Sequence, residues 1–179
     1  MTTFFTSDTH FQHANIIKYS KRPFANVQEM DEELIRRWNE TVGPNDTVWH
    51  LGDFAMGNQG NVRTLRQRLN GTIHLCRGNH DRWDLIEQAN CFDSLQDVAF
   101  FKLDGDFIFL SHYGHRVWNG SHKGTYHLYG HSHGGLEPIA RSLDVGVDEW
   151  DYRPVTMAQI KARLETMGLA EPVTPHNHR

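Results

Sequence analysis

The chain has 179 residues, of which 38% are hydrophobic and 22% are charged, which is enough for one ordinary core and too few for two roomy domains. Its 18 Lys and Arg against 22 Asp and Glu give a formal net charge of −4, and this excludes a generally basic surface for nucleic acid. The apolar stretches fall far short of the ~20 residues of a membrane span, and the first residues lack a secretory signal pattern. We therefore expect a cytoplasmic protein without membrane contact, with one domain over residues 1–168 and a flexible tail over 169–179.

The first half of the chain alternates between strand and helix patterns. Asn26, with Glu29 three residues later, predicts a capped helix that runs to about Val42. Strands are expected at Thr2–Thr6, Thr47–Leu51 and Thr72–Cys76, and further helices at Val62–Leu69 and Trp83–Ala89. This order is β-α-β-α-β and indicates an α/β architecture.

The second half of the chain is dominated by extended runs. Asp104-Gly105-Asp106 is a tight-turn signal between two such runs, so a β-hairpin is expected there. The expected elements are Val98–Leu103, Phe107–His112, Tyr126–Tyr129, Ser142–Val147 and a last helix to about Met167 that Thr156 and Gln159 cap. The whole pattern predicts an α/β sandwich of two sheet layers with helices outside.

Side chains that bind metal ions gather just after the predicted strands, where loops rather than cores carry function. The sequence has 13 His, and imidazole is the commonest metal ligand in proteins. The clusters are Asp8-Thr-His10, Gly52-Asp53, Gly78-Asn79-His80-Asp81, Ser111-His112 and Gly130-His131-Ser-His133.

Most of these clusters also have an ordinary structural interpretation. An Asp at a strand end is usually a turn former or a helix cap, and Gly78 to Asp81 has the composition of a tight turn. The His131 and His133 pair, in a loop bounded by glycines, has little packing rationale. A two-metal site explains all five clusters together, whereas separate turns would have to present oxygen and imidazole ligands at five strand ends by accident.

The ligand types indicate which ions such a site would hold. Carboxylate, amide and imidazole groups without thiolate suit Mn²⁺, Fe²⁺, Zn²⁺ or Ni²⁺, and neither Cys76 nor Cys91 lies in a ligand-rich loop. Two cations about 3.5–4 Å apart would neutralise phosphate oxygens and lower the pKa of a bridging water. The sequence therefore predicts hydrolytic phosphoryl-transfer chemistry.

The motifs D-x-H, G-D, G-N-H-D, H and G-H-x-H, in this order between Asp8 and His133, resemble those of the calcineurin-like metallophosphoesterase superfamily. The resemblance implies a four-layer α/β/β/α sandwich with a dimetal site at the carboxyl ends of the strands. It implies one ion held by Asp8, His10 and His133, a second held by Asn79, His112 and His131, and Asp53 as the bridge between them. It also implies that His80 contacts the phosphate and protonates the leaving alkoxide, while a metal-bridging hydroxide attacks in line.

Departures from the superfamily pattern narrow the expected substrate. The run from Gly52 to Gly57 lacks the Arg-Gly that follows G-D in the protein phosphatases of the superfamily, so protein substrates are not expected. The opening from Ser7 to His13 and the later Arg22-Pro-Phe24 resemble small prokaryotic and phage phosphoesterases. The expected substrate is a small phosphodiester or phosphomonoester, with nucleotides among the candidates. Two divalent ions are expected as cofactors, Mn²⁺ first and Fe, Zn, Ni or Mg as alternatives.

A binding scaffold that kept this fold and lost turnover is the alternative function. Scaffold relatives in the superfamily lack part of the ligand or acid set, whereas all eight residues assigned above are present here. A structural zinc protein would have a closed site of four ligands, which seven ligand candidates argue against. The sequence indicates no oligomeric state.

Other residues near the motifs have two interpretations each. His13 could approach the metal region beside His10, bind phosphate as a donor, or cap residues 14–19. Arg22 is expected on a basic rim with Lys18 and Lys21, or in an ordinary solvated loop. The substrate-binding candidates are His13, Arg22, Asn79 and His80. Asp81 either orients His80 or caps the following helix. Two further groups are open between a site role and a packing role: Tyr113, His115 and Trp118 as stacking aromatics or core, and Asp144 and Asp148 as partners of a metal-binding His or a polar edge.

Overall fold

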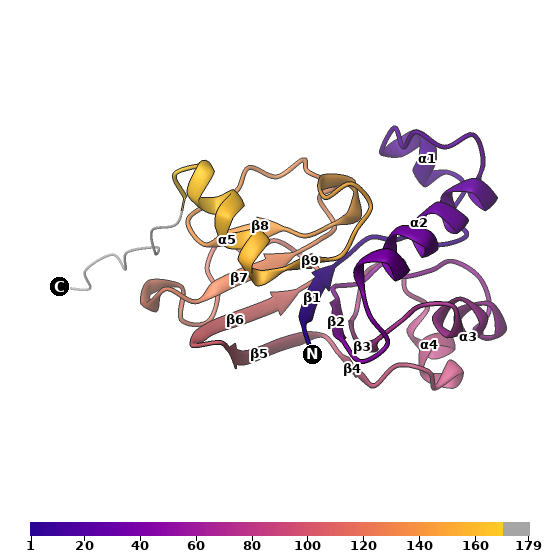
Figure 1. The fold of residues 1–179 in the computed structure, drawn as a ribbon, viewed down its shortest axis with the longest axis horizontal. Coiled ribbons are helices and arrows are strands. Elements are labelled where there is room, and N and C mark those ends of the chain that lie inside the picture. The colour runs from indigo at the N-terminus through magenta and orange to yellow at the C-terminus, as the bar shows by residue number, and fades with distance from the viewer. Residues whose placement is uncertain (170–179) are drawn as a thin grey trace.

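Two β-sheets form the centre of the molecule in this computed structural model, which describes residues 1–169 (Figure 1). The first sheet has the strand order β4-β3-β2-β1-β9. Its strands are β1 (Thr3–Thr6), β2 (Thr47–His50), β3 (Thr72–Cys76), β4 (Ser94–Gln96) and β9 (Val155–Thr156). Strands β1 to β4 run parallel and β9 is antiparallel to β1. The loops after β1, β2 and β3 therefore leave the sheet at the same edge.

The second sheet has the order β5-β6-β7-β8. Its strands are β5 (Val98–Leu103), β6 (Asp106–Ser111), β7 (Tyr126–Tyr129) and β8 (Ser142–Asp144). The predicted hairpin is confirmed, because β5 and β6 pair antiparallel and Asp104 and Gly105 both have positive φ, at 49° and 97°, as a two-residue type I′ turn requires. Strands β6, β7 and β8 are parallel, so their following loops also share one edge.

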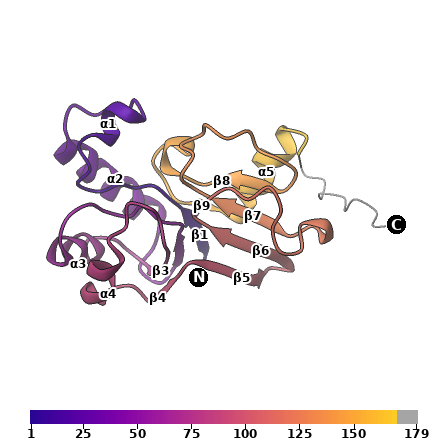
Figure 2. The same ribbon diagram turned by 180° about the vertical axis from the view of Figure 1, so that it is seen from behind.

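Helices cover the first sheet on its outer face (Figure 2). They are α2 (Val27–Thr41), α3 (Gln59–Gln67) and α4 (Trp83–Ala89), while the short α1 (Ile16–Tyr19) precedes α2 and α5 (Met157–Thr166) follows β9. Asn26 caps α2 by accepting the Glu29 N–H, as predicted. Helix α3 begins at Gln59, three residues before the predicted Val62. The reason is the cap, since the Asn58 side chain accepts the Asn61 N–H.

Residues 1–169 form two hydrophobic cores, one on each face of the first sheet. Successive side chains of a strand point to opposite faces, so Phe4 packs under the helices and Phe5 packs between the sheets. Ile160 and Leu164 of α5 join the core between the sheets. The predicted arrangement of two sheets with helices is confirmed.

Some expected elements differ in extent. The strand expected over 142–147 ends at Asp144, and the chain then turns into the 3₁₀ helix η2 (Val147–Glu149). Trp118, in the segment between β6 and β7 that also contains the 3₁₀ helix η1 (Ser121–Lys123), is buried against His127 on the outer face of the second sheet, so it has a packing role. Leu169, the first residue of the predicted tail, packs on the inter-sheet core, and the rest of that tail lies outside the described residues.

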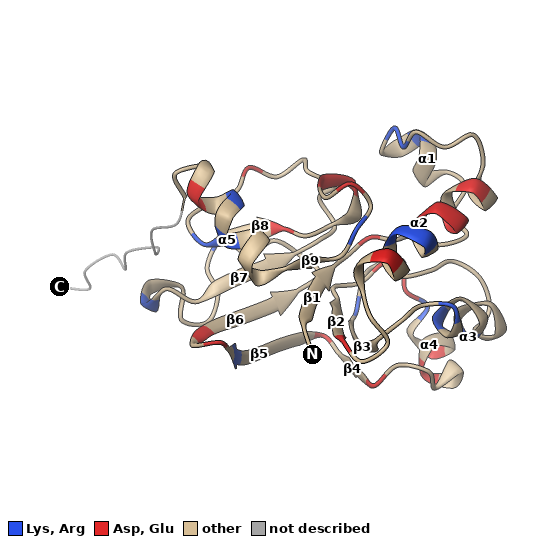
Figure 3. Ribbon diagram, viewed as in Figure 1, with Lys and Arg blue, Asp and Glu red and all other residues tan. Residues whose placement is uncertain are grey.

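Charged residues are distributed over many elements rather than collected on one (Figure 3). Helix α2 carries both signs, with Glu33 contacting both Arg36 and Arg37. Within residues 1–169, we find no helix long and apolar enough to cross a membrane.

Candidate metal centre

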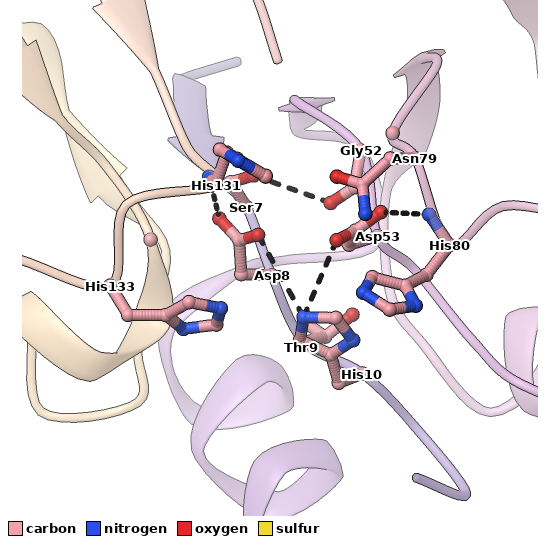
Figure 4. Close-up of polar contacts among 12 residues, drawn as sticks. Ser7, Asp8, Thr9, His10, Gly52, Asp53, Asn79, His80, His131 and His133 are labelled. Atoms are coloured by element: carbon pink, nitrogen blue, oxygen red, sulfur yellow. Dashed lines mark hydrogen bonds and ion pairs between the residues drawn. The ribbon is translucent and has the colours of Figure 1, made fainter. Parts of the chain in front are cut away.

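The loops that follow five strands converge where the two sheets meet, and they bring the predicted ligands together (Figure 4). Parallel pairing of Ser7 with Gly146 joins the end of β1 to the segment after β8 at this seam. The ligand atoms form two groups, each with all atoms within 4.8 Å of one another: Asp8, His10 and His133 in one, and Asp53, His112 and His131 in the other. Asn79 joins the second group, with its Oδ1 2.9 Å from His112 Nε2.

Asp53 lies between the two groups. Its Oδ2 is 3.5 Å from His10 Nε2 and 3.6 Å from His112 Nε2. Its other oxygen, Oδ1, accepts the backbone N–H of His80 at 2.8 Å. One carboxylate oxygen is therefore fixed by the backbone, and the other faces a member of each group.

Five of the seven candidate ligands have left-handed backbone conformations. The φ angles are 57° at Asp8, 50° at His10, 56° at Asp53, 66° at His131 and 46° at His133. Such conformations cost free energy for residues with a Cβ and concentrate at functional sites. Backbone hydrogen bonds between the loops hold them, including Asp8 N–H to the Gly52 carbonyl and His10 N–H to the Asp53 carbonyl.

The loops also approach too closely for larger residues. A Cβ on Gly130 would lie 2.3 Å from Oδ2 of Asp8, the oxygen that accepts the His131 N–H at 2.8 Å. A Cβ on Gly78 would lie 2.2 Å from Oδ1 of Asp53. The glycines in these motifs therefore let the chain pass directly behind the carboxylates.

The chemistry of the donor atoms fits divalent cations. Among the residues that the structure describes, Asp8 Oδ1 and His10 Nε2 are buried without a hydrogen-bond partner, and such atoms are costly unless something binds them. His112 donates from Nδ1 to the Leu51 carbonyl at 2.8 Å, so its Nε2 presents a lone pair toward the Asn79 oxygen. A cation bound to both atoms would relieve the repulsion between these two acceptors.

Burial shifts the ionisation of these groups in opposite directions. It raises the pKa of Asp8 well above its ordinary value, with the charges of Asp144 and Asp53 adding to the rise, and it raises the pKa of Asp53. It also depresses the pKa of His10 strongly and lowers that of His112 to about 4. The imidazoles of His10 and His112 are therefore neutral near pH 7, which is the form that binds metal, and a cation would offset the cost of ionising the buried carboxylates.

His133 is oriented by a carboxylate behind it. Asp148, which follows β8 in η2, accepts a hydrogen bond from His133 Nδ1 at 2.6 Å. Burial opposes protonation of His133, but this hydrogen bond and the charge of Asp8 outweigh it and raise its pKa. Asp144 accepts hydrogen bonds from the Ser132 hydroxyl and the Gly134 N–H, which fixes the loop that carries His131 and His133. Both acidic residues thus act on the ligand loop, and they do not form a polar strand edge.

Asp81 has neither of its two expected roles. Its carboxylate accepts the backbone N–H groups of Gly78, Asp53 and Phe54, each at 2.9 Å. Helix α4 has Arg82 as its N-cap without a side-chain hydrogen bond. Asp81 therefore connects the loop after β3 to the loop after β2, because its buried carboxylate accepts N–H groups from both loops.

The expectation that Arg22 lies on a basic rim and binds substrate is wrong. Its side chain is fully buried and forms an ion pair with Asp148, with Nε 2.8 Å from Oδ1. Its remaining N–H groups donate to backbone carbonyls of Asp8 and Thr9 and to Met30. Sequence reasoning missed this role because a buried Arg and an exposed Arg are not distinguished by local composition.

A cavity of about 570 Å³ opens over the two groups. His13 and His80 line it beside the candidate ligands, and the rings of these two residues are each about 5 Å from that of His10. The wall opposite comes from α1 and the residues after it, namely Ile16, Tyr19, Ser20 and Lys21. Sequence analysis does not predict that Tyr19 and Ser20 line the cavity, because no motif marks a single aromatic residue at the end of a four-residue helix.

A second hollow of about 260 Å³ is lined in part by Asn79 and His112. Arg77, Tyr113 and His115 line it. The proposed stacking role of Tyr113 and His115 therefore remains a prediction with a suitable location.

Comparisons with known proteins agree with this geometry. The family model of the calcineurin-like phosphoesterase superfamily domain matches residues 1–137. The chain is 33% identical over 168 residues to the uncharacterized protein MJ1445 of Methanocaldococcus jannaschii, covering 89% of each, and 30% identical to the Gene 66 protein of Mycobacterium phage D29, covering 82% of this chain and 87% of that protein. A solved structure, the protein of unknown function AQ665 from Aquifex aeolicus, superposes with a TM-score of 0.73 at 25% identity over 90% of this chain and 98% of that one. The chain belongs to the calcineurin-like phosphoesterase superfamily.

Proposed function

We propose that this chain hydrolyses a small phosphodiester with the help of two divalent cations. The observation that carries the proposal is the position of Asp53, whose free oxygen lies 3.5–3.6 Å from an imidazole of each ligand group. One ion would be held by Asp8, His10 and His133 and the other by Asn79, His112 and His131, with Asp53 shared. A bound pair of this kind supplies positive charge to the phosphate oxygens and a hydroxide nucleophile near neutral pH.

His80 is proposed as the general acid. Its backbone N–H is fixed on Asp53 Oδ1, and its ring lines the cavity over the two groups. A donor in this place can protonate the leaving oxygen as the P–O bond breaks. His13 lines the same cavity and is proposed as a phosphate contact.

Two separate hollows, each lined in part by candidate ligands, favour a diester over a monoester. An ester bound across the two groups would place one substituent against Tyr19 and the other beside Tyr113. A monoester would use one of these spaces and leave the other to water. Nucleotides fit this description, since they combine a phosphate with an aromatic group that stacks on Tyr side chains.

The test is hydrolysis of bis(p-nitrophenyl) phosphate beside p-nitrophenyl phosphate, by metal-stripped protein refilled with Mn²⁺, with metal content determined in the same samples. We expect Mn²⁺-dependent turnover with the diester preferred. Mn²⁺ is tried first because the ligands are carboxylate, amide and imidazole without thiolate. Two bound ions without turnover of either ester would contradict the proposal and favour a binding scaffold.

Two variants separate the proposed roles. Asp53→Asn should lose both bound metal and turnover, because the shared ligand is gone. His80→Ala should keep both ions and slow turnover by roughly 10² to 10⁴, the usual contribution of a general acid. His122→Ala, at an exposed position in η1, is the control and should change neither. Unchanged turnover in His80→Ala would remove the general-acid assignment.

A further inference from the structure

Arg22 is a buried cation whose hydrogen-bonding capacity is fully used. A guanidinium has five N–H donors, and each has an acceptor here. Nε and Nη2 donate to the two Asp148 oxygens at 2.8 and 2.9 Å. Nη2 also donates to the Asp8 carbonyl at 2.7 Å. Nη1 donates to the Thr9 carbonyl and to Met30 Sδ. No donor remains for a substrate, so the role of this residue must be exerted through its partners.

The first of these partners, Asp148, connects Arg22 to His133. Asp148 Oδ2 accepts from both Arg22 Nη2 and His133 Nδ1. With its proton held at Nδ1 by Asp148, the His133 ring keeps the Nε2 lone pair free for a cation shared with Asp8 and His10. Arg22 holds this carboxylate by two parallel hydrogen bonds, the geometry that fixes a carboxylate best.

The other partners of Arg22 are backbone carbonyls of the loop that carries Asp8 and His10. Both residues have positive φ, a conformation that persists only where surrounding contacts enforce it. Arg22 binds the carbonyl of Asp8 and that of Thr9, between the two candidate ligands. One side chain therefore contacts the loop that carries Asp8 and His10 and, through Asp148, also holds His133.

We propose that Arg22 is a positioning residue for one ion of the pair, the ion held by Asp8, His10 and His133, and that it acts through Asp148 and the Asp8–Thr9 backbone. The second group, Asp53, His112 and His131, has no direct contact with Arg22 among the interactions of the described residues. The inference rests on the proposed function for its two-ion site. A positioning role predicts that loss of Arg22 weakens the binding of one ion, whereas a purely structural ion pair would affect both ions alike.

The test is titration of the metal-stripped protein with Mn²⁺, with free Mn²⁺ followed by its electron paramagnetic resonance signal and protein stability followed in parallel. Arg22→Lys keeps the charge and removes the fork that grips Asp148. We expect one of the two Mn²⁺ dissociation constants to rise about 10- to 100-fold, the usual effect of removing a partner behind a metal ligand, and the other to change less than threefold. His133→Ala and His112→Ala identify which ion is lost.

Arg63→Lys is the matched control, because Arg63 also grips the backbone with two donors, both on the Ala89 carbonyl, and lies away from the ligands. It should change neither constant. Asp148→Asn is the second variant and should weaken the same ion as Arg22→Lys. The long-range ¹H–¹⁵N spectrum of the His133 ring should then show loss of the single Nδ1–H tautomer.

Equal weakening of both ions, or unchanged constants in folded Arg22→Lys and Asp148→Asn proteins, would overturn the inference while leaving the proposed function intact. A wild-type protein that binds no Mn²⁺ pair and lacks turnover would instead overturn the proposed function and the inference together.

Discussion

Asp31 is a half-buried carboxylate near the start of α2 that accepts the backbone N–H of Gln12, just after the first ligand loop. Burial raises its pKa to about 6, against the hydrogen bond from Gln12, which lowers it. An unfolded Asp has a pKa of about 3.9, so the folded protein binds this proton more tightly. The free energy of unfolding therefore falls as pH rises from about 4 to about 6 and stays lower above that range.

Asp31→Asn should remove this loss. We expect the variant to match the wild type near pH 4 and to be more stable by about 1 kcal/mol at pH 7, a value reduced for the partial exposure of the group. The measurement is urea unfolding of both proteins between pH 4 and pH 8. The metal centre titrates in both proteins alike, so its effect cancels in the difference between their free energies of unfolding. Glu32→Gln is the control with the opposite sign, because Arg68 lowers the pKa of Glu32. Equal stability of Asp31→Asn and wild type at pH 7 would contradict the assignment.

The sequence locates the candidate ligands that the structure brings together, because each one follows a strand within one to four residues and the strand signals are strong. It does not predict what lies behind them. Asp81 resembles a helix cap, and Arg22 resembles a surface cation, since their partners are backbone groups of loops distant in the chain. Contacts of this kind depend on how the loops fold together, which local pattern does not contain.

At the scale of elements, α1 packs on the core under the helices through Ile16 and shapes the cavity with its exposed end. It comes between the first ligand loop and α2 in the chain and lies at the upper right of Figure 1, above α2. Tyr19 at its end is 73% exposed and lines the cavity, with its ring 6.4 Å from that of His13. A change there should alter substrate binding without disturbing either core.

Tyr19→Ala should raise KM for bis(p-nitrophenyl) phosphate several-fold, and by about tenfold at most, because one aromatic contact contributes about 0.5–1.5 kcal/mol. The value of kcat and the melting temperature should stay near those of the wild type. Steady-state kinetics and thermal unfolding measure both effects, with Tyr19→Phe as the matched variant that retains the ring. A fall in kcat with unchanged KM would place Tyr19 elsewhere in the mechanism.

The longer elements are predictable from sequence, and the shortest are not. The hairpin between β5 and β6 follows from its Asp-Gly turn, and α2 follows from its cap and apolar face. Strands β4 and β9 have three and two residues, too few for an alternating pattern to appear. They form because neighbouring strands offer open edges, which is a property of the assembled sheet.

At the scale of the whole molecule, the candidate ligands come from both sheets. Loops after β1, β2 and β3 belong to the first sheet, and loops after β6 and β7 belong to the second. Bound cations would therefore link the sheets across their seam and offset the cost of two buried carboxylates. Without cations, the raised pKa values of Asp8 and Asp53 make the folded state less stable as pH rises above about 4.

Metal removal should accordingly lower the melting temperature, and by more at pH 8 than at pH 5.5. At the higher pH the carboxylates must ionise in the folded state, and only the loaded protein compensates them. Thermal unfolding with Mn²⁺ or with EDTA at the two pH values measures the gap, which is the difference in melting temperature between loaded and metal-free protein. In Asp53→Asn this gap should shrink at both pH values. A gap that is the same at both pH values, or wider at pH 5.5, would speak against cation binding by these carboxylates.

The pairing of β1 with β9 also bears on how the protein is made. Phe4 pairs with Thr156, so β1 acquires this neighbour only after about 150 more residues have been added to the chain. At a synthesis rate of about 5–20 residues per second, this edge stays open for roughly 8 to 30 s. An unpaired strand edge is a site of aggregation, so β1, with its aromatic pair Phe4 and Phe5, stays open to wrong pairing until β9 has been made.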